Sequence, residues 1–454
     1  MAIRLGILGA GARGSDTYGR WAIKRPDRAA VAAVADPVPY RRDRLADAGT
    51  VPAAHRYADW RDLIADAEAI GLDAFVIALP DRLHLDAALA AIETGLPVLL
   101  EKPAATTAGD LEALASAARD RKARIWIGHV MRYQPFWIAI RRLVDSGAIG
   151  RLVTMRVEEN IGFWHYAHSY VRGNWRNLAT SSPMVLAKTC HDLDMIRWFA
   201  GESPASVASA GSLTYFRSEN APEGAPGHCL DGCPAADSCP FYAPRYYVEA
   251  LADRDGWPVA LLGDDTSPEG RLEALRAGPY GRCVFHSDND VVDHQQTVVD
   301  FPGGLTATLS TSAFTGQNTR TVRLTGTAGE IAGNLRTGTF EVDLFSPAAV
   351  LPVLPGARIG QRFTRPPLGH RVFEIHAGPA EDEPSRGPQP PGGGAPDHRG
   401  HSGGDEALID AFVTALEGGE SAATDLEAAL DSHRMAFAAE RSRLERRTIP
   451  WEAM

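Results

Sequence analysis

The feature that most constrains this chain is a glycine-rich turn near its start. An apolar run, Ile3 to Leu8, leads directly into Gly9-Ala10-Gly11-Ala12-Arg13-Gly14, and a segment compatible with a helix follows at once. In a strand–turn–helix unit of this kind, the first glycine permits a tight turn, the second lets a pyrophosphate approach the backbone, and the third lets helix and strand pack closely. The free N–H groups at the helix start then face the phosphates. We therefore expect a dinucleotide to bind at Gly9, Gly11, Ala12, Arg13 and Gly14.

A second apolar run, Ala29 to Ala35, ends at Asp36. In the dinucleotide-binding pattern, an acidic residue about 20 positions beyond the glycines accepts a hydrogen bond from a ribose hydroxyl. A carboxylate would also repel the 2′-phosphate of NADP, so Asp36 favours NAD as the cofactor. Arg41 and Arg42 follow closely in the sequence and would soften this preference, which leaves NADP as the second alternative.

The first 130 residues alternate between two patterns, short apolar runs typical of buried strands and segments with apolar residues at helical spacing. The later strands are expected at 74–79, 98–100 and 124–128, and the helices at 60–69, 83–94 and 108–121. This alternation predicts an α/β fold with a doubly wound parallel sheet, a Rossmann domain over residues 1–130, whose ligands bind beyond the carboxyl ends of the strands. Further cofactor contacts are therefore expected at Leu79, Pro80, His84, Glu101, Lys102 and Arg132, with His129 and Tyr133 at the substrate end.

Residues 131–454 change character. After a helix expected at 135–146, alternating runs rich in β-branched residues predict a large, mostly antiparallel sheet, open on one face, in an α+β domain. These strands are expected at 151–160, 206–215, 291–300, 305–312, 321–324 and 339–344, and further helices at 188–200, 405–417 and 425–446. An insertion with cysteines at about 217–285 resists assignment, and the proline, glycine and charge at about 378–404 indicate a flexible loop.

The bulk properties argue against several classes of protein. The 454-residue chain has a formal net charge of −11, which does not favour nucleic acid or an anionic membrane as a partner. No apolar run approaches the roughly 20 residues of a membrane span, and the first residues lack the pattern of a signal peptide. Five cysteines, an odd number, suit a reducing compartment. We therefore expect a cytoplasmic protein.

Three of the cysteines, Cys229, Cys233 and Cys239, fall within eleven residues, and Cys283 follows later. Four thiolates could form a closed tetrahedral site, for which zinc is the first choice and an iron–sulfur cluster the second. The spacings differ from the usual Cys-x2-Cys knuckle, so reduced thiols or a redox pair are an equal alternative. A structural role is expected in either case, because the insertion is remote in sequence from the other candidate residues.

The chain resembles the Gfo/Idh/MocA family of oxidoreductases. Besides the glycine turn, the resemblance rests on Glu101-Lys102-Pro103 after a strand, Pro80 and His84, Arg132-Tyr133, Gly147-Ala-Ile-Gly150, Trp175-Arg176 and His191-Asp-Leu-Asp194. It covers nearly the whole chain, and the insertion with cysteines is similar to a feature of one subgroup.

The resemblance implies a Rossmann domain followed by an α+β domain whose sheet makes subunit contacts, so a homodimer or homotetramer is expected. It also implies NAD(P)-dependent hydride transfer to or from a hydroxyl of a sugar, glycoside or cyclitol. Some members use the same hydride transiently to cleave glycosidic bonds. This sequence departs from the family at one position, because many members carry an Asp four residues before the active-site His, where this chain has Ala187 followed by Lys188.

Removal of a hydride from an alcohol carbon requires a base for the hydroxyl proton and a cation that stabilises the alkoxide. Lys102, placed after a central strand, is the candidate for one or both roles, and Glu101 could accept a hydrogen bond from it or from a ribose. His191 is expected to open a helix, whose N-terminal dipole favours a neutral imidazole able to carry the proton. Lys188, three residues before His191, would either share this pocket or be exposed.

Aromatic and basic side chains are concentrated between residues 164 and 176. Aromatic faces can stack on the C–H faces of sugars, and Arg and His donate to hydroxyls; the alternative is a packing patch with surface charges. The substrate contacts expected from this segment are Trp164, His165, His168, Arg172, Trp175 and Arg176.

Three functions remain open from the sequence. The first is an NAD-dependent dehydrogenase of a sugar, glycoside or cyclitol. The second is a glycoside-cleaving enzyme that oxidises its substrate, eliminates the leaving group and returns the hydride, which the pair Ala187 and Lys188 keeps open. The third, a non-catalytic dinucleotide sensor, is disfavoured by the presence of both Lys102 and His191.

Overall fold

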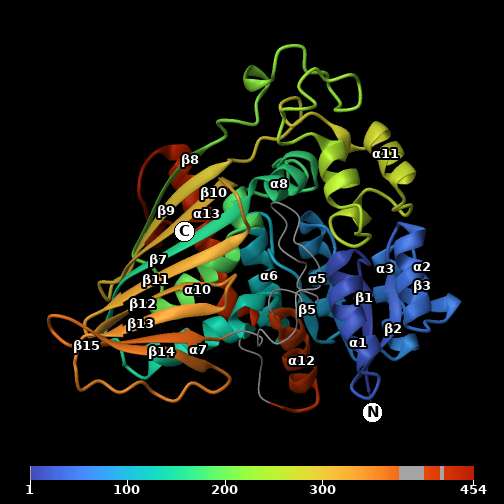
Figure 1. The fold of residues 1–454 in the computed structure, drawn as a ribbon. Helices are drawn as coiled ribbons and strands as arrows, with labels where there is room; N and C mark the ends of the chain where they lie inside the picture. The colour runs from blue at the N-terminus through green and yellow to red at the C-terminus, as the bar shows by residue number, and fades with distance from the viewer. Residues whose placement is uncertain (1, 378–402, 420–423) are drawn as a thin grey trace.

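The computed structural model describes residues 2–377, 403–419 and 424–454. Two sheets organise these residues, a six-stranded sheet near the N-terminus and a ten-stranded sheet farther along the chain (Figure 1). Most of the expected flexible loop, residues 378–402, lies outside the described residues. No helix among the described residues is both long and apolar enough to cross a membrane.

The six-stranded sheet has the order β3-β2-β1-β4-β5-β6, and every neighbouring pair is parallel. Its central strands are almost wholly buried because both faces are covered, which explains their continuous apolar runs. The predicted Rossmann sheet is therefore confirmed. The strands are β1 (Ile3–Leu8), β2 (Ala29–Ala35), β3 (Arg56–Tyr57), β4 (Ala74–Ile77), β5 (Val98–Leu100) and β6 (Ile125–Ile127).

Helices connect these strands and cover both faces of the sheet. The longest of them, α6, begins where the Thr107 side chain accepts a hydrogen bond from the Asp110 N–H, a common N-cap. The first connection is a helical segment, Ala12–Gly19, that continues into α1. The helices are α1 (Arg20–Lys24), α2 (Pro39–Ala48), α3 (Trp60–Ala65), α4 (Ala67–Ile70), α5 (His84–Glu93) and α6 (Ala108–Arg121).

The ten-stranded sheet has the order β14-β15-β13-β12-β11-β7-β10-β9-β8-β16. Strands β7 and β10 pair in parallel and the other pairs are antiparallel, so the predicted mostly antiparallel sheet is confirmed. The strands are β7 (Leu152–Gly162), β8 (Ser206–Ser212), β9 (His294–Asp300), β10 (Thr306–Thr315), β11 (Thr319–Gly326), β12 (Gly329–Asn334), β13 (Thr339–Leu344), β14 (Arg358–Arg365), β15 (His370–His376) and β16 (Ile449–Pro450).

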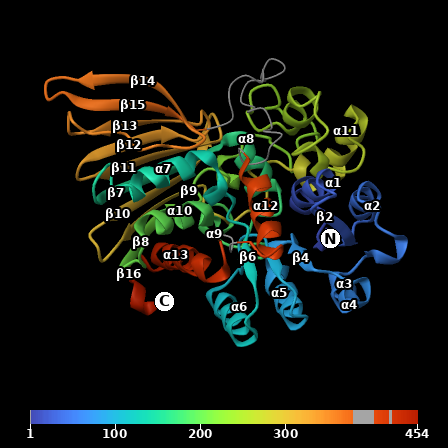
Figure 2. The ribbon, with the colours of Figure 1, turned by 90° about the horizontal axis from the view of Figure 1, so that it is seen from below.

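Three long helices, α7 (Pro135–Asp145), α10 (Cys190–Ala200) and α13 (Leu426–Glu445), lie against one face of this sheet (Figure 2). Their buried side chains and the inward residues of the strands form one core, in which Trp137 and Phe340 are almost fully enclosed. Strands β9 and β10 alternate between buried and more exposed residues, which is the pattern of a sheet packed on one side.

The C-terminal helices also reach the first sheet. In α12 (Gly404–Leu416), Phe412 packs edge-on against Trp126 of β6 at 5.1 Å between ring centroids. Leu426 and Leu430 at the start of α13 join the core beneath α5 and α6. Residues from the end of the chain therefore fix the six-stranded sheet relative to the ten-stranded one.

The insertion with cysteines lies between β8 and β9. It contains α11 (Pro268–Ala277) and several short helical turns, and it has a small core of its own that includes Tyr247 and Leu275. It packs on α8 (Phe163–Tyr166) and on the helical segment that continues α8 as far as Arg172 (Figure 1).

The glycine turn generates a test of the packing. A Cβ on Gly14 would lie 1.8 Å from the Gly9 carbonyl oxygen, whereas a Cβ on Gly11 would meet nothing within 4 Å. We expect Gly14→Ala to lower the free energy of unfolding by at least about 1–3 kcal/mol, since the overlap is with backbone that cannot easily move. Gly11→Ala is the matched control and should unfold within about 1 kcal/mol of the parent in urea; equal stability of the two variants would contradict the described turn.

Candidate active site

The glycine turn at the end of β1 is held in a conformation that only glycine adopts easily. Gly9 has a φ of +93°, and a Cβ there would lie 2.4 Å from the Ala78 carbonyl oxygen at the end of β4. The Asp36 carboxylate is buried and accepts hydrogen bonds from the N–H groups of Ala10 and Val38, each at 2.8 Å. The predicted ribose acceptor thus lies directly against the turn, while the space above Gly11 is open.

An ionic cluster joins this turn to the end of β5. The Arg13 guanidinium donates to the Glu101 carboxylate at 2.5 Å and to the Asp405 carboxylate of α12 at 2.7 Å. The Tyr18 hydroxyl donates to the same Glu101 oxygen at 2.5 Å. Burial would raise the pKa of Glu101, but Arg13 and this hydroxyl outweigh it and hold the pKa below its usual range. Glu101 is therefore an ionised anchor for three segments of the chain.

Lys102 follows Glu101 at the carboxyl end of β5, in a turn with a cis Lys102–Pro103 peptide bond. Its ammonium nitrogen donates to the carbonyl oxygen of Ala187 in α9 (Met184–Ala187) at 2.9 Å. The buried His84 supports this turn, since its two ring nitrogens lie 2.7 Å from the Pro103 oxygen and 2.8 Å from the Leu79 oxygen. The Lys102 side chain therefore connects the two sheets and is only partly buried.

Three histidines gather beside this turn. The His191 ring, on the first turn of α10, lies with its Nδ1 atom 3.5 Å from Nδ1 of His129, and the ring of His433 lies 5.5 Å from His129 between centroids. The buried His433 accepts a hydrogen bond from the Ala104 N–H at Nε2. Burial lowers the pKa of His129 and lowers that of His433 to about 3, so both rings are neutral at pH 7.

Arg132 and Asp194 form a buried bidentate ion pair below these histidines. Arg132 Nε and Nη2 lie 2.8 and 2.7 Å from the two carboxylate oxygens of Asp194. Burial would raise the pKa of Asp194, but the Arg132 charge outweighs it and lowers the pKa. The predicted cofactor contact Arg132 is thus also the partner that orients α10.

Lys188 is not exposed but belongs to a second buried cluster. Its ammonium lies 3.1 Å from Glu159 of β7, and Arg320 of β11 lies 2.7 Å from both Glu159 and Asp192. Burial lowers the pKa of Lys188, with Glu159 opposing the shift. Lys188 therefore directly follows Ala187, whose side chain has no carboxylate to offer the Lys102 ammonium.

The predicted substrate segment divides into two groups. Trp164 stacks on His165 at 5.6 Å between centroids, and burial together with the Lys188 charge lowers the pKa of His165 well below its usual range. The His165 ring therefore lies near Lys188. His168 lies farther away, where it is buried and bonded to the Tyr247 hydroxyl of the insertion at 2.7 Å.

The remaining members of this segment hold other parts of the structure. Arg172 donates to the carbonyl oxygens of Arg282 and Phe241 in the insertion, both at 2.8 Å. Trp175 Nε1 donates to Asp81 of the first sheet at 3.1 Å, and Arg176 pairs with Asp288 at 2.8 Å. Their contacts are thus with the protein, and Tyr133 likewise bonds the Thr424 hydroxyl at 3.1 Å.

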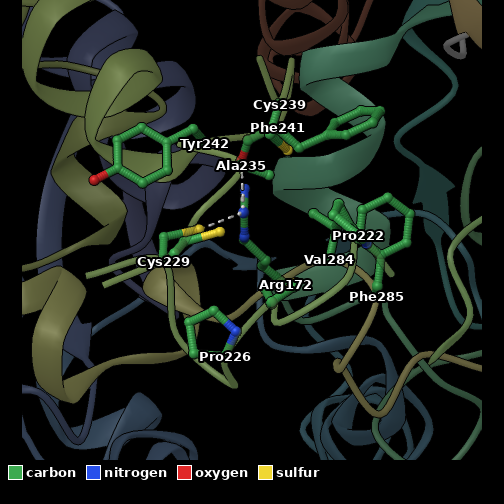
Figure 3. Close-up of a pocket in the computed structure, with 13 residues that line it drawn as sticks. Arg172, Pro222, Pro226, Cys229, Ala235, Cys239, Phe241, Tyr242, Val284 and Phe285 are labelled. Carbon is green, nitrogen blue, oxygen red and sulfur yellow. Dashed lines mark hydrogen bonds between the residues drawn. The ribbon is translucent and has the colours of Figure 1, made fainter. Parts of the chain in front are cut away.

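The structure does not support the expected zinc site. All four cysteines of the insertion line one small cavity of about 10 Å³ and carry no disulfide. The Arg172 guanidinium lies between Cys229 and Cys239 in this cavity, with Nη2 3.6 Å from the Cys229 sulfur (Figure 3). Burial raises the pKa of Cys239 and Cys283, which favours neutral thiols over metal-binding thiolates, and no group of three or more His, Cys, Asp or Glu in the described part of the chain is arranged to hold a metal.

Comparison with known families and proteins adds to this geometry. Residues 3–129 match the model described as "Oxidoreductase family, NAD-binding Rossmann fold", and residues 137–228 match the "GFO/IDH/MocA C-terminal domain". The chain thus matches the models of both domains of the Gfo/Idh/MocA family. Its first sheet is therefore an NAD-binding Rossmann fold, as the glycine turn predicts.

Curated relatives in this family match part of the chain. Inositol 2-dehydrogenase 1 of Saccharopolyspora erythraea is 34% identical over 200 residues, which are 44% of this chain and 54% of that protein. The putative oxidoreductase YteT of Bacillus subtilis is 26% identical over 268 residues, 58% of this chain and 60% of its own length. The matched part thus spans just over half the length of these relatives.

Solved structures match the whole chain. A levoglucosan dehydrogenase in complex with NADH and levoglucosan has a TM-score of 0.67 at 17% identity and covers 99% of both chains. An oxidoreductase from Agrobacterium radiobacter in complex with NAD+, L-tartaric acid and magnesium has a TM-score of 0.66 at 17% identity over 100% of both chains. At these identities the likeness concerns the fold.

Sequence reasoning did not single out several residues of the site. Glu159 and Arg320 lie on separate strands, and each has the alternating neighbours of an ordinary β-residue. His433 and Asp405 lie on C-terminal helices more than 300 residues from the turns they support. Only Asp192 and Asp194 carried a signal, through the motif that follows His191.

The neutral His433 generates a test of pH dependence. Its folded pKa of about 3 lies below the ordinary value, so it contributes stability that is present above about pH 6.5 and is lost as the pH falls towards 3. Between pH 7 and pH 5 the unfolding free energy of the parent should fall by about 2 kcal/mol more than that of His433→Gln. Urea unfolding at both pH values measures this, and parallel pH profiles would refute a neutral buried ring.

Proposed function

We propose that the protein is an NAD-dependent oxidoreductase that transfers a hydride between the nicotinamide and a hydroxyl of a sugar, glycoside or cyclitol. The observation that carries the proposal is the position of Lys102. Its ammonium lies at the carboxyl end of β5, against the last residue of α9, and its charge acts on the buried His129, whose Nδ1 lies 3.5 Å from Nδ1 of His191. Ligands of doubly wound sheets bind at this edge, so the charged group and the proton carriers meet where a cofactor would lie.

The residues around the glycine turn have the space and the hydrogen-bonding groups to hold a dinucleotide. The open space above Gly11 and the backbone N–H groups that begin the helical segment at Ala12 suit a pyrophosphate. Asp36 uses two of its lone pairs on backbone N–H groups and has others left for a ribose hydroxyl. The cofactor contributes the nicotinamide carbon that accepts or returns the hydride.

The side chains supply proton transfer and charge stabilisation. The Lys102 ammonium is held by a neutral carbonyl rather than a carboxylate, so its positive charge is free to stabilise a developing alkoxide. We assign His191 as the group that takes the hydroxyl proton, because its ring lies on the first turn of α10, 3.5 Å from the buried His129 between Nδ1 atoms. Lys188, paired with Glu159, would fix a further hydroxyl of the substrate.

One observation favours a second function. The Lys102 ammonium donates a hydrogen bond to the backbone of Ala187, and among the described residues no carboxylate accepts a hydrogen bond from it there. Such a site could retain its cofactor, oxidise a glycoside to the ketone, let the C2 proton and the aglycone leave, add water to the resulting double bond and then return the hydride to the ketone. Aglycone release without net NADH, accompanied by deuterium exchange at the sugar C2, would identify this cycle, whereas stoichiometric NADH at 340 nm would identify the dehydrogenase.

The face of the ten-stranded sheet that the described helices leave uncovered, together with the free cysteines, leads us to propose how the protein assembles and where it is located. Helices cover one face of the ten-stranded sheet in the described structure, and the family resemblance leads us to propose the other face as a homodimer or homotetramer contact. The cysteines of the described residues are free thiols, which suits a cytoplasmic location.

The role of Lys102 is directly testable. Lys102→Ala should lower kcat/KM for hydride transfer by about 10²–10⁴, because a cation next to the reacting oxygen is lost. Lys24→Ala, which removes an exposed lysine of α1, is the matched control and should behave like the parent. Parent-like turnover of Lys102→Ala in both the NADH and the aglycone assay would disprove the enzymatic proposal.

The cofactor preference depends on Asp36. Asp36→Ala should weaken NAD about ten- to hundredfold, the range for a lost hydrogen bond to a charged group, and weaken NADP less because the repulsion disappears as well. Calorimetric titration with each nucleotide measures both affinities. Equal losses for NAD and NADP would contradict the proposed preference.

A further inference from the structure

The cysteine-containing insertion places a tryptophan beside the candidate substrate contacts. Trp257 lies between the helical turn 245–250 and α11, and 36% of its surface is exposed. Its ring lies 5.2 Å from His165 and 6.1 Å from Trp164 between centroids. Trp164 and His165 are only half-buried, so the three rings form one aromatic surface.

Further aromatic residues pack against the three rings of this surface and hold them in place. His168 packs edge-on against Trp257 at 5.4 Å and stacks on Tyr280 at 4.8 Å with an angle of 13° between the rings. The His168 ring is fixed in turn by its hydrogen bond to the Tyr247 hydroxyl. Tyr246 also packs against Trp164, at 5.7 Å between ring centroids. A preorganised aromatic surface costs little conformational entropy when a ligand binds.

The surface is connected to the reacting centre by polar groups. His165 Nδ1 lies 3.1 Å from the side-chain oxygen of Asn318, two residues before Arg320, which shares Glu159 with Lys188. Lys188 in turn follows Ala187, whose carbonyl oxygen holds the Lys102 ammonium. The groups that a bound carbohydrate would meet therefore begin with the Lys102 ammonium at the proposed reacting hydroxyl. The Lys188–Glu159 ion pair comes next, followed by the imidazole of His165 and then by the two indole rings. Hydroxyl-binding groups followed by stacking faces match a carbohydrate longer than one ring.

Trp257 lies outside the part of the chain that the family models match. The family's C-terminal domain model matches residues 137–228, and Trp257 lies beyond that match, in the insertion. An element of this kind can change which substrate is accepted without altering the hydride chemistry.

We propose that Trp257 and Trp164 form a second sugar-ring subsite, so that the substrate is a disaccharide or a comparable glycoside, oxidised on the ring beside Lys102 and stacked through its other ring on the indoles. This inference rests on the proposed function for the position of the reacting ring. Trp257 is a specificity-determining residue in this arrangement, and the hydride chemistry does not require it.

The test compares ligands that differ by one ring. Maltose, cellobiose, trehalose and lactose, each against the methyl glycoside of its non-reducing sugar, are titrated calorimetrically into the NAD-loaded full chain, and initial rates are measured with the same compounds. We expect at least one disaccharide to bind about tenfold or more tightly than its methyl glycoside, and Trp257→Ala to remove that difference while leaving the methyl glycoside unchanged.

Two controls separate the subsite from folding effects. Trp257→Phe should keep most of the disaccharide preference, and Phe345→Ala, which removes an exposed ring next to β13, should keep all of it. No disaccharide preference, or an equal effect of Trp257→Ala on both ligands of each pair, would overturn the subsite even if hydride transfer is found. Selective loss of disaccharide binding without any turnover would support the subsite and refute the proposed chemistry.

Discussion

The hydrogen bond from the Lys102 ammonium to the Ala187 carbonyl oxygen is the contact on which the candidate site depends. It joins the carboxyl end of a strand in the first sheet to the helices that cover the second. Both of its ends are fixed independently, by Glu101 and the Arg13 cluster on one side and by the packing of α9 and α10 on the other. A lysine held in this way keeps its charge at one position, which is the property that electrostatic stabilisation of an alkoxide requires.

Buried charges around this contact are paired with opposite charges. Glu101 is matched by Arg13, Asp194 by Arg132, and Glu159 with Asp192 by Lys188 and Arg320. Removing one member of a buried pair leaves its partner uncompensated, at a cost of about 3–5 kcal/mol. These pairs therefore set the geometry of the site more than they add to stability, because each links elements that are distant in the sequence.

The sequence predicted what depends on local pattern. The glycine turn, the strands β1 and β2, helix α6 and the alternation of β9 and β10 follow from backbone requirements and from periodic burial, which neighbouring residues reveal. The short edge strands β3 and β16 were not predicted, because a strand of two residues shows no periodic pattern of burial. The outer strand β14 was not predicted either, because it is exposed along its whole length.

Long-range pairing was beyond the sequence. The spacing of the cysteines suggested a metal, but the Arg172 guanidinium, which enters their cavity from another segment, could not be inferred from that spacing. The same limit concealed Arg320, His433 and Trp257, whose importance arises only where distant segments meet. Arg176, which is predicted to bind substrate, pairs with Asp288, a contact that a local cluster of charged and aromatic groups does not reveal.

The central claim is that the Lys102 ammonium lies at the reacting oxygen. A crystal structure of the chain with NAD and a bound, slowly turned-over carbohydrate would test it most directly. The account predicts the nicotinamide at the carboxyl ends of β4 and β5, with Lys102 Nζ about 2.6–3.2 Å from a substrate hydroxyl. A nicotinamide placed elsewhere, or a Lys102 side chain turned away from the bound carbohydrate, would contradict it.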